Sequence, residues 1–503
     1  MSRFTLSSLA FACLAVTALG QADSRPNIVL IIADDLAWDD LGCTGNRGVR
    51  TPNLDRLAEG GMQFTSAFLT ISSCSPSRAS LITGTYPHQT DAEQLHWPLP
   101  ADRLTFVELL KASGYWTAAA GKWHLGDAAK DRFDEVREAD VSGFQLPTGK
   151  AAKAGKILQK AVGDARSGCD QWVPLLKSRP RNKPFFLWLA ALDPHRDYDE
   201  GILKQPHQPG DVRLPPYVAD TPESRRDYAL YYDEITRLDR FVGAVIAELK
   251  EQNAVDNTLV LFISDNGRPF PRDKTTLYDS GIKTPFIVHW PGRVDAGSRC
   301  NSLVSSVDIA PTFLELAGLS TPKVFEGRSF LLLLRNPQHS IRNFVFAERN
   351  WHDYEDRVRA VRNSRFKYIR NFYNDLPNTP PADVVRSVAY REMIRLRNDD
   401  RLVDAQKNTF MQPRAKEELY DIQADPFELK NLAVDPAQAK RLKLFRRTLA
   451  KWQQETGDTE PRFRTLDEFD REDGQALPVR ERPRPDKAEM TRRLEAYYGK
   501  QAK

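Results

Sequence analysis

The chain has 503 residues, of which 41% are hydrophobic and 28% charged, the composition of an ordinary folded protein with one large domain or two. The formal net charge of +4 is small, so charge gives no reason to expect a nucleic-acid partner. No stretch beyond the N-terminus is long and apolar enough to cross a bilayer, so we expect no stable membrane insertion.

Residues 1–22 have the pattern of a secretory signal peptide. A short basic start is followed by an apolar stretch, residues 6–19, that is too short to span a bilayer. Small residues at positions 18–22 then offer a cleavage site. We therefore expect a secreted or periplasmic protein.

Five cysteines are too few to build a disulfide scaffold. Cys13 would leave with the signal peptide, and Cys74 lies in a motif of its own. If Cys74 is modified, at most one disulfide can form among Cys43, Cys169 and Cys300. The sequence does not decide which pair that would be.

Four apolar, β-rich runs each end in polar residues. They cover residues 27–33, 115–120, 185–192 and 258–263, and they are followed by Asp34-Asp35, Gly121-Lys122-Trp123-His124, Asp193-Pro194-His195 and Ser264-Asp265-Asn266-Gly267. Continuous apolar strands are typical of a parallel sheet that is buried on both faces. Helix-like segments at residues 51–60 and 105–114 lie between them. We therefore predict an α/β fold with a large doubly wound mixed sheet flanked by helices.

The strand–helix alternation fades near residue 335. We place a first domain, which would carry the active site, at residues 23–335 and a smaller C-terminal α+β subdomain at residues 336–503. This subdomain is expected to contain a small antiparallel sheet and helices at residues 436–455. Its charged, proline-bearing tail ends in a helix-like stretch at residues 487–498.

Cys74 begins the stretch C-S-P-S-R-A-S-L-I-T-G, which has the pattern of a loop that runs into a helix. Such a junction gathers free backbone N–H groups and the positive end of a helix dipole, and both suit an anion. A cysteine there is expected to have a lowered pKa and to be reactive. Arg78 follows one turn later. The alternative interpretation is a half-buried structural cysteine at a helix start.

Two polar pairs, Asp34-Asp35 and Asp265-Asn266, follow two of the predicted strands. In α/β folds, functional residues lie at the carboxyl ends of strands. Hard divalent cations such as Ca²⁺ prefer carboxylate and amide oxygens, and no His/Cys cluster indicates zinc. One pair alone would more often be turn or capping chemistry. Two pairs beside a candidate nucleophile predict a metal site with one calcium ion per chain.

Four further residues carry candidate catalytic groups. Lys122 and His124 are alternate residues of G-K-W-H-L-G, and alternate residues on an extended segment point the same way, so both could face one pocket. His195 follows a predicted strand, and Lys274 follows the Asp-Asn pair after a few residues. The structural alternative is an exposed lysine and a packed histidine in the first motif, and a solvated loop lysine at position 274.

Together these motifs resemble those of type I sulfatases, the formylglycine-dependent members of the alkaline phosphatase superfamily. The resemblance runs from Asn27 to Asn431 and includes D-D, C-S-P-S-R-A-S-L-I-T-G, G-K-W-H-L-G, P-H, S-D-N-G, D-K-T-T-L-Y-D-S-G and E-L-Y-D…D-P-F-E…N-L. It implies that a maturation enzyme oxidises Cys74 to formylglycine, whose hydrated aldehyde is the nucleophile.

The resemblance also implies a role for each residue of the site. The calcium ligands would be Asp34, Asp35, the modified Cys74, Asp265 and Asn266. Arg78 would support residue 74. Lys122 and Lys274 would bind the sulfate oxygens, with Lys274 also near the leaving oxygen. His124 and His195 would transfer protons. His195 would act as general acid to the leaving group.

The substrate is less defined by the motifs. The segments around Cys74 and His195, the S-D-N-G segment and residues 449–456 resemble the N-sulfoglucosamine sulfohydrolase branch, whereas Lys274 and G-K-W-H-L-G look like ordinary O-sulfatases. We expect hydrolysis of sulfate esters on a sulfated carbohydrate, a polysaccharide or glycosaminoglycan, with an N-sulfoglucosamine sulfamidase as the alternative. Candidate substrate contacts, chosen as aromatic or basic residues near the motifs, are His88, His96, Trp97, Arg196 and Arg268.

Two other classes of function stay open. A phosphohydrolase or phosphonohydrolase of the same superfamily would share the fold and the metal acids. It would usually carry a threonine or serine nucleophile and extra histidine ligands for two zinc ions. A non-enzymatic carbohydrate-binding relative would be expected to have a broken motif, and no expected position is missing.

Overall fold

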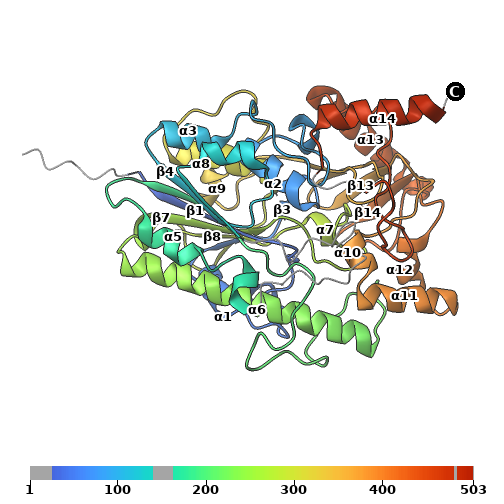
Figure 1. Ribbon diagram of the computed structural model, residues 1–503, viewed down its shortest axis with the longest axis horizontal. Helices are drawn as coiled ribbons and strands as arrows, with labels where there is room; N and C mark the ends of the chain where they lie inside the picture. The colour runs from blue at the N-terminus through green and yellow to red at the C-terminus, as the bar shows by residue number, and fades with distance from the viewer. Residues whose placement is uncertain (1–24, 140–162, 481–483, 502–503) are drawn as a thin grey trace, which may run out of the picture.

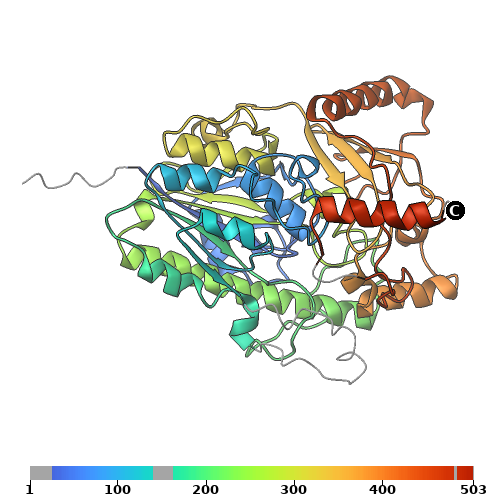
Figure 2. The same ribbon diagram turned by 45° about the horizontal axis from the view of Figure 1, so that its top comes forward.

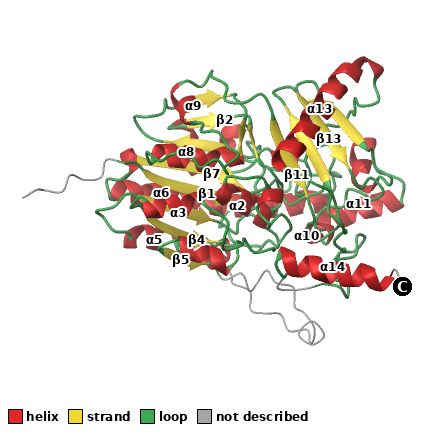
Figure 3. Cartoon of the chain, turned by 90° about the horizontal axis from the view of Figure 1, so that it is seen from above, coloured by secondary structure: helices red, strands yellow, loops and turns green. Residues whose placement is uncertain are grey.

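The computed structural model describes residues 25–139, 163–480 and 484–501 (Figure 1). A large sheet with helices on both faces lies beside a smaller sheet built from the C-terminal part (Figure 3). The predicted signal peptide, residues 1–22, lies outside the described residues. Among the described helices, none combines the length and the apolar character that a membrane span requires.

The large sheet has eight strands in the order β5-β4-β6-β1-β7-β8-β2-β9. The four predicted apolar runs are β4, β6, β1 and β7, and they are neighbouring parallel strands. β8 is antiparallel to both of its neighbours, so the sheet is mixed, as predicted. The strands are β1 (Asn27–Ala33), β2 (Met62–Phe64), β4 (Trp116–Gly121), β5 (Glu135–Glu138), β6 (Phe185–Ala190), β7 (Thr258–Ser264), β8 (Phe286–His289) and β9 (Ser298–Cys300).

Alternate side chains of β1 enter two different cores, because both faces of the sheet are covered. Ile28, Leu30 and Ile32 pack in one core with residues of α3 and α8. Val29 and Ile31 pack in the other with residues of α1, α5 and α6. Figure 1 shows the two groups of helices on opposite faces of the sheet. Their bounds are α1 (Pro52–Glu59), α3 (Phe106–Ala112), α5 (Trp172–Ser178), α6 (Pro222–Glu251) and α8 (Ile309–Leu316).

The C-terminal sheet is antiparallel, as predicted, and its strands lie in chain order. One face packs against α13 (Ala439–Thr456). On the other face, Ala360 and Ile369 share a cluster with Phe68 and Leu277 of the first domain, so the sheet docks the subdomain onto that domain. The strands are β11 (Val345–Arg349), β12 (Val358–Arg362), β13 (Phe366–Asn371) and β14 (Glu417–Asp421).

The chain end returns to the first domain. Figure 2 shows α14 in red at the end of the chain. At the start of this helix, Lys487 Nζ lies 3.0 Å from Asp91 Oδ1 and 2.8 Å from Glu93 Oε1. The remaining elements are β3 (Ala67–Phe68), α2 (Cys74–Thr83), α7 (Asp279–Ile282), β10 (Val304–Ser305), α9 (Leu331–Arg335), α10 (Ala382–Val385), α11 (Val388–Asn398), α12 (Asp404–Lys407) and α14 (Lys487–Gln501).

The cysteines that the structure describes, Cys43, Cys74, Cys169 and Cys300, are all free thiols, so the disulfide left open by the sequence is not formed.

Candidate active site

The four predicted strand ends meet at one edge of the large sheet. Ala33 at the end of β1 pairs with Ser264 at the end of β7, so the two acidic pairs follow at the same level. β6 lies between β1 and β4 and is parallel to both, which brings the segments of His195 and Lys122 to the same edge. Parallel neighbours end on the same side of a sheet, and this geometry assembles the site.

Cys74 is the first residue of α2, and its thiol reaches this edge. Its Sγ lies 3.4 Å from Asp34 Oδ1 and 4.0 Å from Asp35 Oδ1. Ser73 is the N-cap and has an extended backbone, and its side chain makes no capping hydrogen bond. All ten residues of α2 are buried, so Cys74 and the helix that carries it both lie in the interior of the protein.

Three carboxylates and the thiol form one buried cluster. One ligand atom each from Asp34, Asp35, Cys74 and Asp265 lies within 4.8 Å of the others. Asp265 Oδ1 and Asn266 Oδ1 are buried and have no hydrogen-bond partner among the described residues. Buried oxygens nearly always have a partner, and Ca²⁺ prefers carboxylate and amide oxygens of this kind. The residues therefore fit a hard cation.

Three basic side chains contact the same carboxylates. The pairs are Arg78 with Asp265 (Nε to Oδ2, 2.8 Å), Lys122 with Asp34, and Lys274 with Asp35 (Nζ to Oδ2, 2.7 Å). Burial opposes the charge on both lysines, but the paired carboxylates outweigh it and hold the pKa of each lysine above its usual value. The charges of the three acids and three bases therefore cancel.

The pKa of each acid depends on the charges that it faces. Burial acts to raise the pKa of Asp34, but Lys122 and the other nearby cations hold it below its usual range. Burial, with a contribution from Asp34, raises the pKa of Asp265 to about 6. The same two causes raise the pKa of the Cys74 thiol well above its usual value, so the predicted lowering is wrong. One helix end does not offset full burial beside three carboxylates.

His124 lies beside the cluster, but not on the straight extended segment that was predicted. Its φ of 59° is in the left-handed region, so the chain turns there. Its Nε2 lies 2.7 Å from Nδ1 of His96, a second residue with a left-handed backbone. Burial lowers the pKa of His124 well below its usual value, and His96 and Lys122 lower it further. The imidazole is therefore neutral at neutral pH.

Of the five candidate substrate contacts, His96 lies in this group and the other four are engaged inside the protein. His88 Nδ1 lies 2.7 Å from Glu348 Oε2, and Arg196 NH1 donates to Asp227 Oδ1 at 2.7 Å. Arg268 pairs with Asp39. Trp97 is 5% exposed and lies in the same core as residues of α3. Their expected contact with substrate stays a prediction. Closeness to a motif along the chain does not determine where a side chain points.

Three residues of the C-terminal subdomain border the site and were not expected from the sequence. Trp351 packs with Cys74 and Leu95. His352 Nδ1 lies 2.6 Å from Ser73 Oγ. Asp383 Oδ2 lies 3.2 Å from Lys274 Nζ and 3.7 Å from His195 Nε2. No motif surrounds these three residues in the sequence. They reach the site because the C-terminal sheet packs on the first domain.

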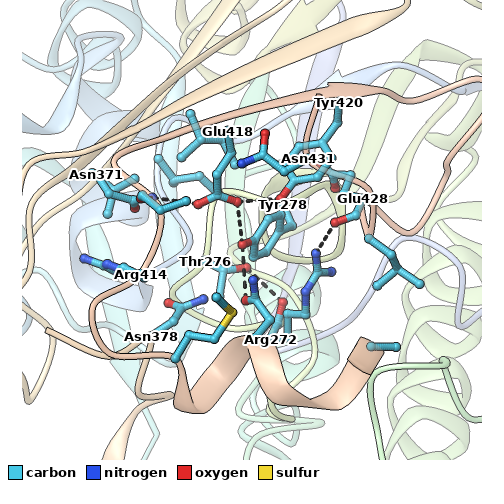
Figure 4. A pocket seen from close by; sticks show the side chains of 18 of the residues that line it. Arg272, Thr276, Tyr278, Asn371, Asn378, Arg414, Glu418, Tyr420, Glu428 and Asn431 are labelled. Carbon is cyan, nitrogen blue, oxygen red and sulfur yellow. Dashed lines mark hydrogen bonds between the residues drawn. The ribbon is translucent and has the colours of Figure 1, made fainter. Parts of the chain in front are cut away.

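The loop that carries Lys274 is supported from behind by the C-terminal sheet. Arg272, Tyr278 and Glu418 are among the residues that line a cavity of about 310 Å³. Figure 4 shows these three side chains. Glu418 Oε2 accepts hydrogen bonds from the hydroxyls of Tyr278 (2.8 Å) and Tyr420 (2.6 Å), and the Arg272 guanidinium lies 3.7 Å from the centre of the Tyr278 ring. These polar side chains bind one another. We therefore interpret them as a structural contact that holds the Lys274 loop against the C-terminal sheet.

Comparison with known proteins identifies the family. The family profile described as Sulfatase matches residues 26–319. A second profile, described as N-sulphoglucosamine sulphohydrolase, C-terminal, matches residues 270–385. The chain belongs to the sulfatase family. It is a sulfuric ester hydrolase, and it resembles the N-sulfoglucosamine sulfohydrolase branch.

Individual relatives extend over most of this sulfatase. The N-sulphoglucosamine sulphohydrolase of Homo sapiens is 31% identical over 487 residues, which cover 89% of this chain and 93% of the human protein. An ulvan-active sulfatase of Formosa agariphila is 28% identical over 484 residues, covering 86% of this chain and 76% of that protein. The structure of Ps i-CgsB in complex with k-i-k-neocarrahexaose has a TM-score of 0.63 and 25% identity, covering 86% of this chain and 93% of that one.

Proposed function

We propose that this sulfatase hydrolyses sulfate esters on a sulfated carbohydrate, with formylglycine derived from Cys74 as the nucleophile and one calcium ion as the cofactor. The observation that carries the proposal is the position of Cys74 Sγ at the start of α2, inside a buried cluster of carboxylates. The sulfur marks the place of a hydrated aldehyde, which supplies one hydroxyl as nucleophile and a second through which sulfate is released. A formylglycine-generating maturation enzyme is the implied partner.

The metal would be held by Asp34, Asp35, Asp265, Asn266 and residue 74. A bound calcium ion supplies Lewis-acid stabilisation of the sulfate oxygens. Asp265 Oδ1 and Asn266 Oδ1 would gain the partner that they lack among the described residues. Because the three carboxylates are already balanced by three cations, a divalent ion would make the site positive, as an anionic sulfate group requires.

The cations and imidazoles of the chain would then divide the remaining tasks. Lys122 and Lys274 would hold the sulfate oxygens with charged ammonium groups, and Lys274 would also lie near the leaving oxygen. His195, 20% exposed, would protonate the leaving oxygen. His124, neutral because its pKa is lowered, would accept a proton from the hydroxyl at residue 74. Arg78 would hold the site together, because its NH1 donates to the Lys122 carbonyl at 2.9 Å.

The names of the relatives support a saccharide substrate. One relative is called ulvan-active, and one structural neighbour was solved with a neocarrahexaose. A second candidate function is N-sulfoglucosamine sulfamidase, favoured by the 31% identity to the human N-sulphoglucosamine sulphohydrolase. We also propose, from the signal-peptide pattern of residues 1–22, that the protein is secreted or periplasmic.

The test is a substrate screen with protein whose Cys74 conversion has been measured. Released sulfate is quantified for O-sulfated and N-sulfated monosaccharides and oligosaccharides, an aryl sulfate, and phosphate and phosphonate esters, with Cys74→Ala as the control. We expect release from an O-sulfated saccharide. Release from terminal N-sulfated glucosamine alone would select the sulfamidase. An aryl sulfate that is hydrolysed far faster than every saccharide, or a phosphonate ester preferred over all sulfates, would contradict the proposal.

A further inference from the structure

Asp383 brings a negative charge from the C-terminal subdomain into the active site. It lies in the first turn of α10, where its Oδ1 accepts a hydrogen bond from Val384 N at 2.9 Å. The start of this helix is tied down in turn, because Ala382 N donates to Asp353 Oδ2 at 3.1 Å. One oxygen of Asp383 is therefore held by its own backbone, and the other is left to face the site.

The second oxygen meets the two groups that the proposed function places at the departing oxygen. Asp383 Oδ2 lies 3.2 Å from Lys274 Nζ and 3.7 Å from His195 Nε2. Asp35 Oδ2 contacts the same two groups and lies 2.7 Å from Lys274 Nζ and 3.8 Å from His195 Nε2. Asp35 also belongs to the cluster around Cys74, whereas Asp383 lies outside that cluster.

Exposure shows from which side a substrate approaches. The side chains of His195 and Asp383 are 20% and 18% exposed. The side chain of Asp35 is 0% exposed, and those of Lys274 and Lys122 are 1% and 8% exposed. A sulfate group placed at Cys74 therefore leaves the rest of its molecule on the side of His195 and Asp383.

We propose that Asp383 is a positioning residue for departure of the leaving group, an inference that rests on the proposed function. As the bond between sulfur and the sugar oxygen breaks, its electron pair stays on that oxygen, which takes the proton from His195, while the sulfuryl group passes to the nucleophile at residue 74. Asp383 fixes the Lys274 ammonium and the His195 imidazole in the places from which they serve that oxygen.

The alternative is that Asp383 only docks the subdomain through its ion pair with Lys274. The two roles predict different dependence on the leaving group. A group that assists departure matters greatly for a sugar alkoxide, which is a poor leaving group, and little for an activated phenol, which leaves without a proton. A docking residue changes the turnover of all substrates by the same factor.

The experiment compares Asp383→Asn and Asp383→Glu with the wild type on a series of aryl sulfates of increasing phenol acidity and on the best sulfated saccharide from the screen. Asp375→Asn is the matched control, since it removes the same charge from an exposed ion pair with Arg464 in the same subdomain. We expect Asp383→Asn to lower kcat/KM about 10- to 100-fold for the poorest leaving groups and less than about 3-fold for para-nitrophenyl sulfate. Asp383→Glu should recover part of the loss.

An equal loss for every leaving group, or no loss for any, would overturn the inference. Thermal unfolding of each variant separates a folding defect from a kinetic one. If Asp383→Asn fails to fold, the leaving-group dependence of Asp383→Glu decides the question, because a longer carboxylate displaces Lys274 and His195 without removing the charge. A wild-type enzyme that releases sulfate from no sulfate ester would refute the proposed function instead, so the two failures are distinguishable.

Discussion

Arg78 offers a direct test of the site, because its side chain contacts both the Asp265 carboxylate and the Lys122 backbone carbonyl and is 0% exposed. Its Nε and NH2 each lie 2.8 Å from Asp265 Oδ2, and its NH1 donates to the carbonyl of Lys122 at 2.9 Å. Arg78→Lys keeps the positive charge, but a single ammonium cannot make all three contacts. Asp265 and Lys122 would then both shift.

The size of the effect follows from the lost contacts. Losing one hydrogen bond to a carboxylate costs about 1.5–3 kcal/mol and losing one to a carbonyl about 0.5–1.5 kcal/mol, so we expect a loss of about 2–4 kcal/mol in the free energy of unfolding. A displacement of about 1 Å in catalytic groups lowers turnover about 100-fold. We therefore expect Arg78→Lys to lose about 100-fold in kcat on sulfated substrate.

Arg359 is the matched control in the C-terminal subdomain. It is 1% exposed, its Nε and NH2 contact Asp458 at 2.7 and 2.8 Å, and its NH1 donates to the carbonyl of Val358 at 2.9 Å. Arg359→Lys should therefore lose a similar amount of stability but little turnover. Unfolding curves and steady-state kinetics of both variants are the assay. Equal loss of turnover in the two variants, or full turnover in Arg78→Lys, would refute the reasoning.

Two further predictions concern the metal and a buried ion pair. Metal analysis of the purified protein should find about one hard divalent ion per chain, and a chelator should lower the unfolding temperature until Ca²⁺ is restored; two zinc ions per chain would contradict this. His88 and Glu348 predict a pH effect: burial acts to lower the pKa of His88, but Glu348 outweighs it and the pKa is raised. A raised histidine pKa stabilises the fold fully below the unfolded value of about 6.5, and the contribution is lost as pH rises through the folded pKa. The stability difference between wild type and His88→Gln should therefore shrink above about pH 6.5, and a difference that grows with pH would contradict the assignment.

The central sheet and most of the site could be predicted because they depend on local patterns. Each apolar run ends in polar residues, and parallel strands end on the same side of a sheet whatever their order. Asp34 and Asp265 were therefore expected to meet although the strand order was unknown. The start of α2 at Cys74 was likewise visible, because its motif has the pattern of a loop that enters a helix.

The remaining features depend on packing between distant segments. Asp383 reaches Lys274 only because the C-terminal sheet docks through Ile369 and its neighbours, and nothing around Asp383 in the sequence shows this. The pKa of Cys74 depends on its burial and on the carboxylates that surround it after folding. The position of Cys74 at a helix start, which the sequence shows, gives neither of these. Arg196 lies next to a catalytic candidate, yet its side chain turns to Asp227.

The measurement that tests the central claim most directly is the relation between Cys74 conversion and turnover. The protein is produced with and without a formylglycine-generating enzyme, and peptide mass spectrometry gives the fraction of Cys74 that has lost its thiol and gained an aldehyde or its hydrate. Sulfate release from the same samples should rise in proportion to that fraction and vanish in Cys74→Ala, whose unfolding curve should stay close to that of the wild type. Full turnover in protein whose Cys74 is an unmodified thiol would contradict the account.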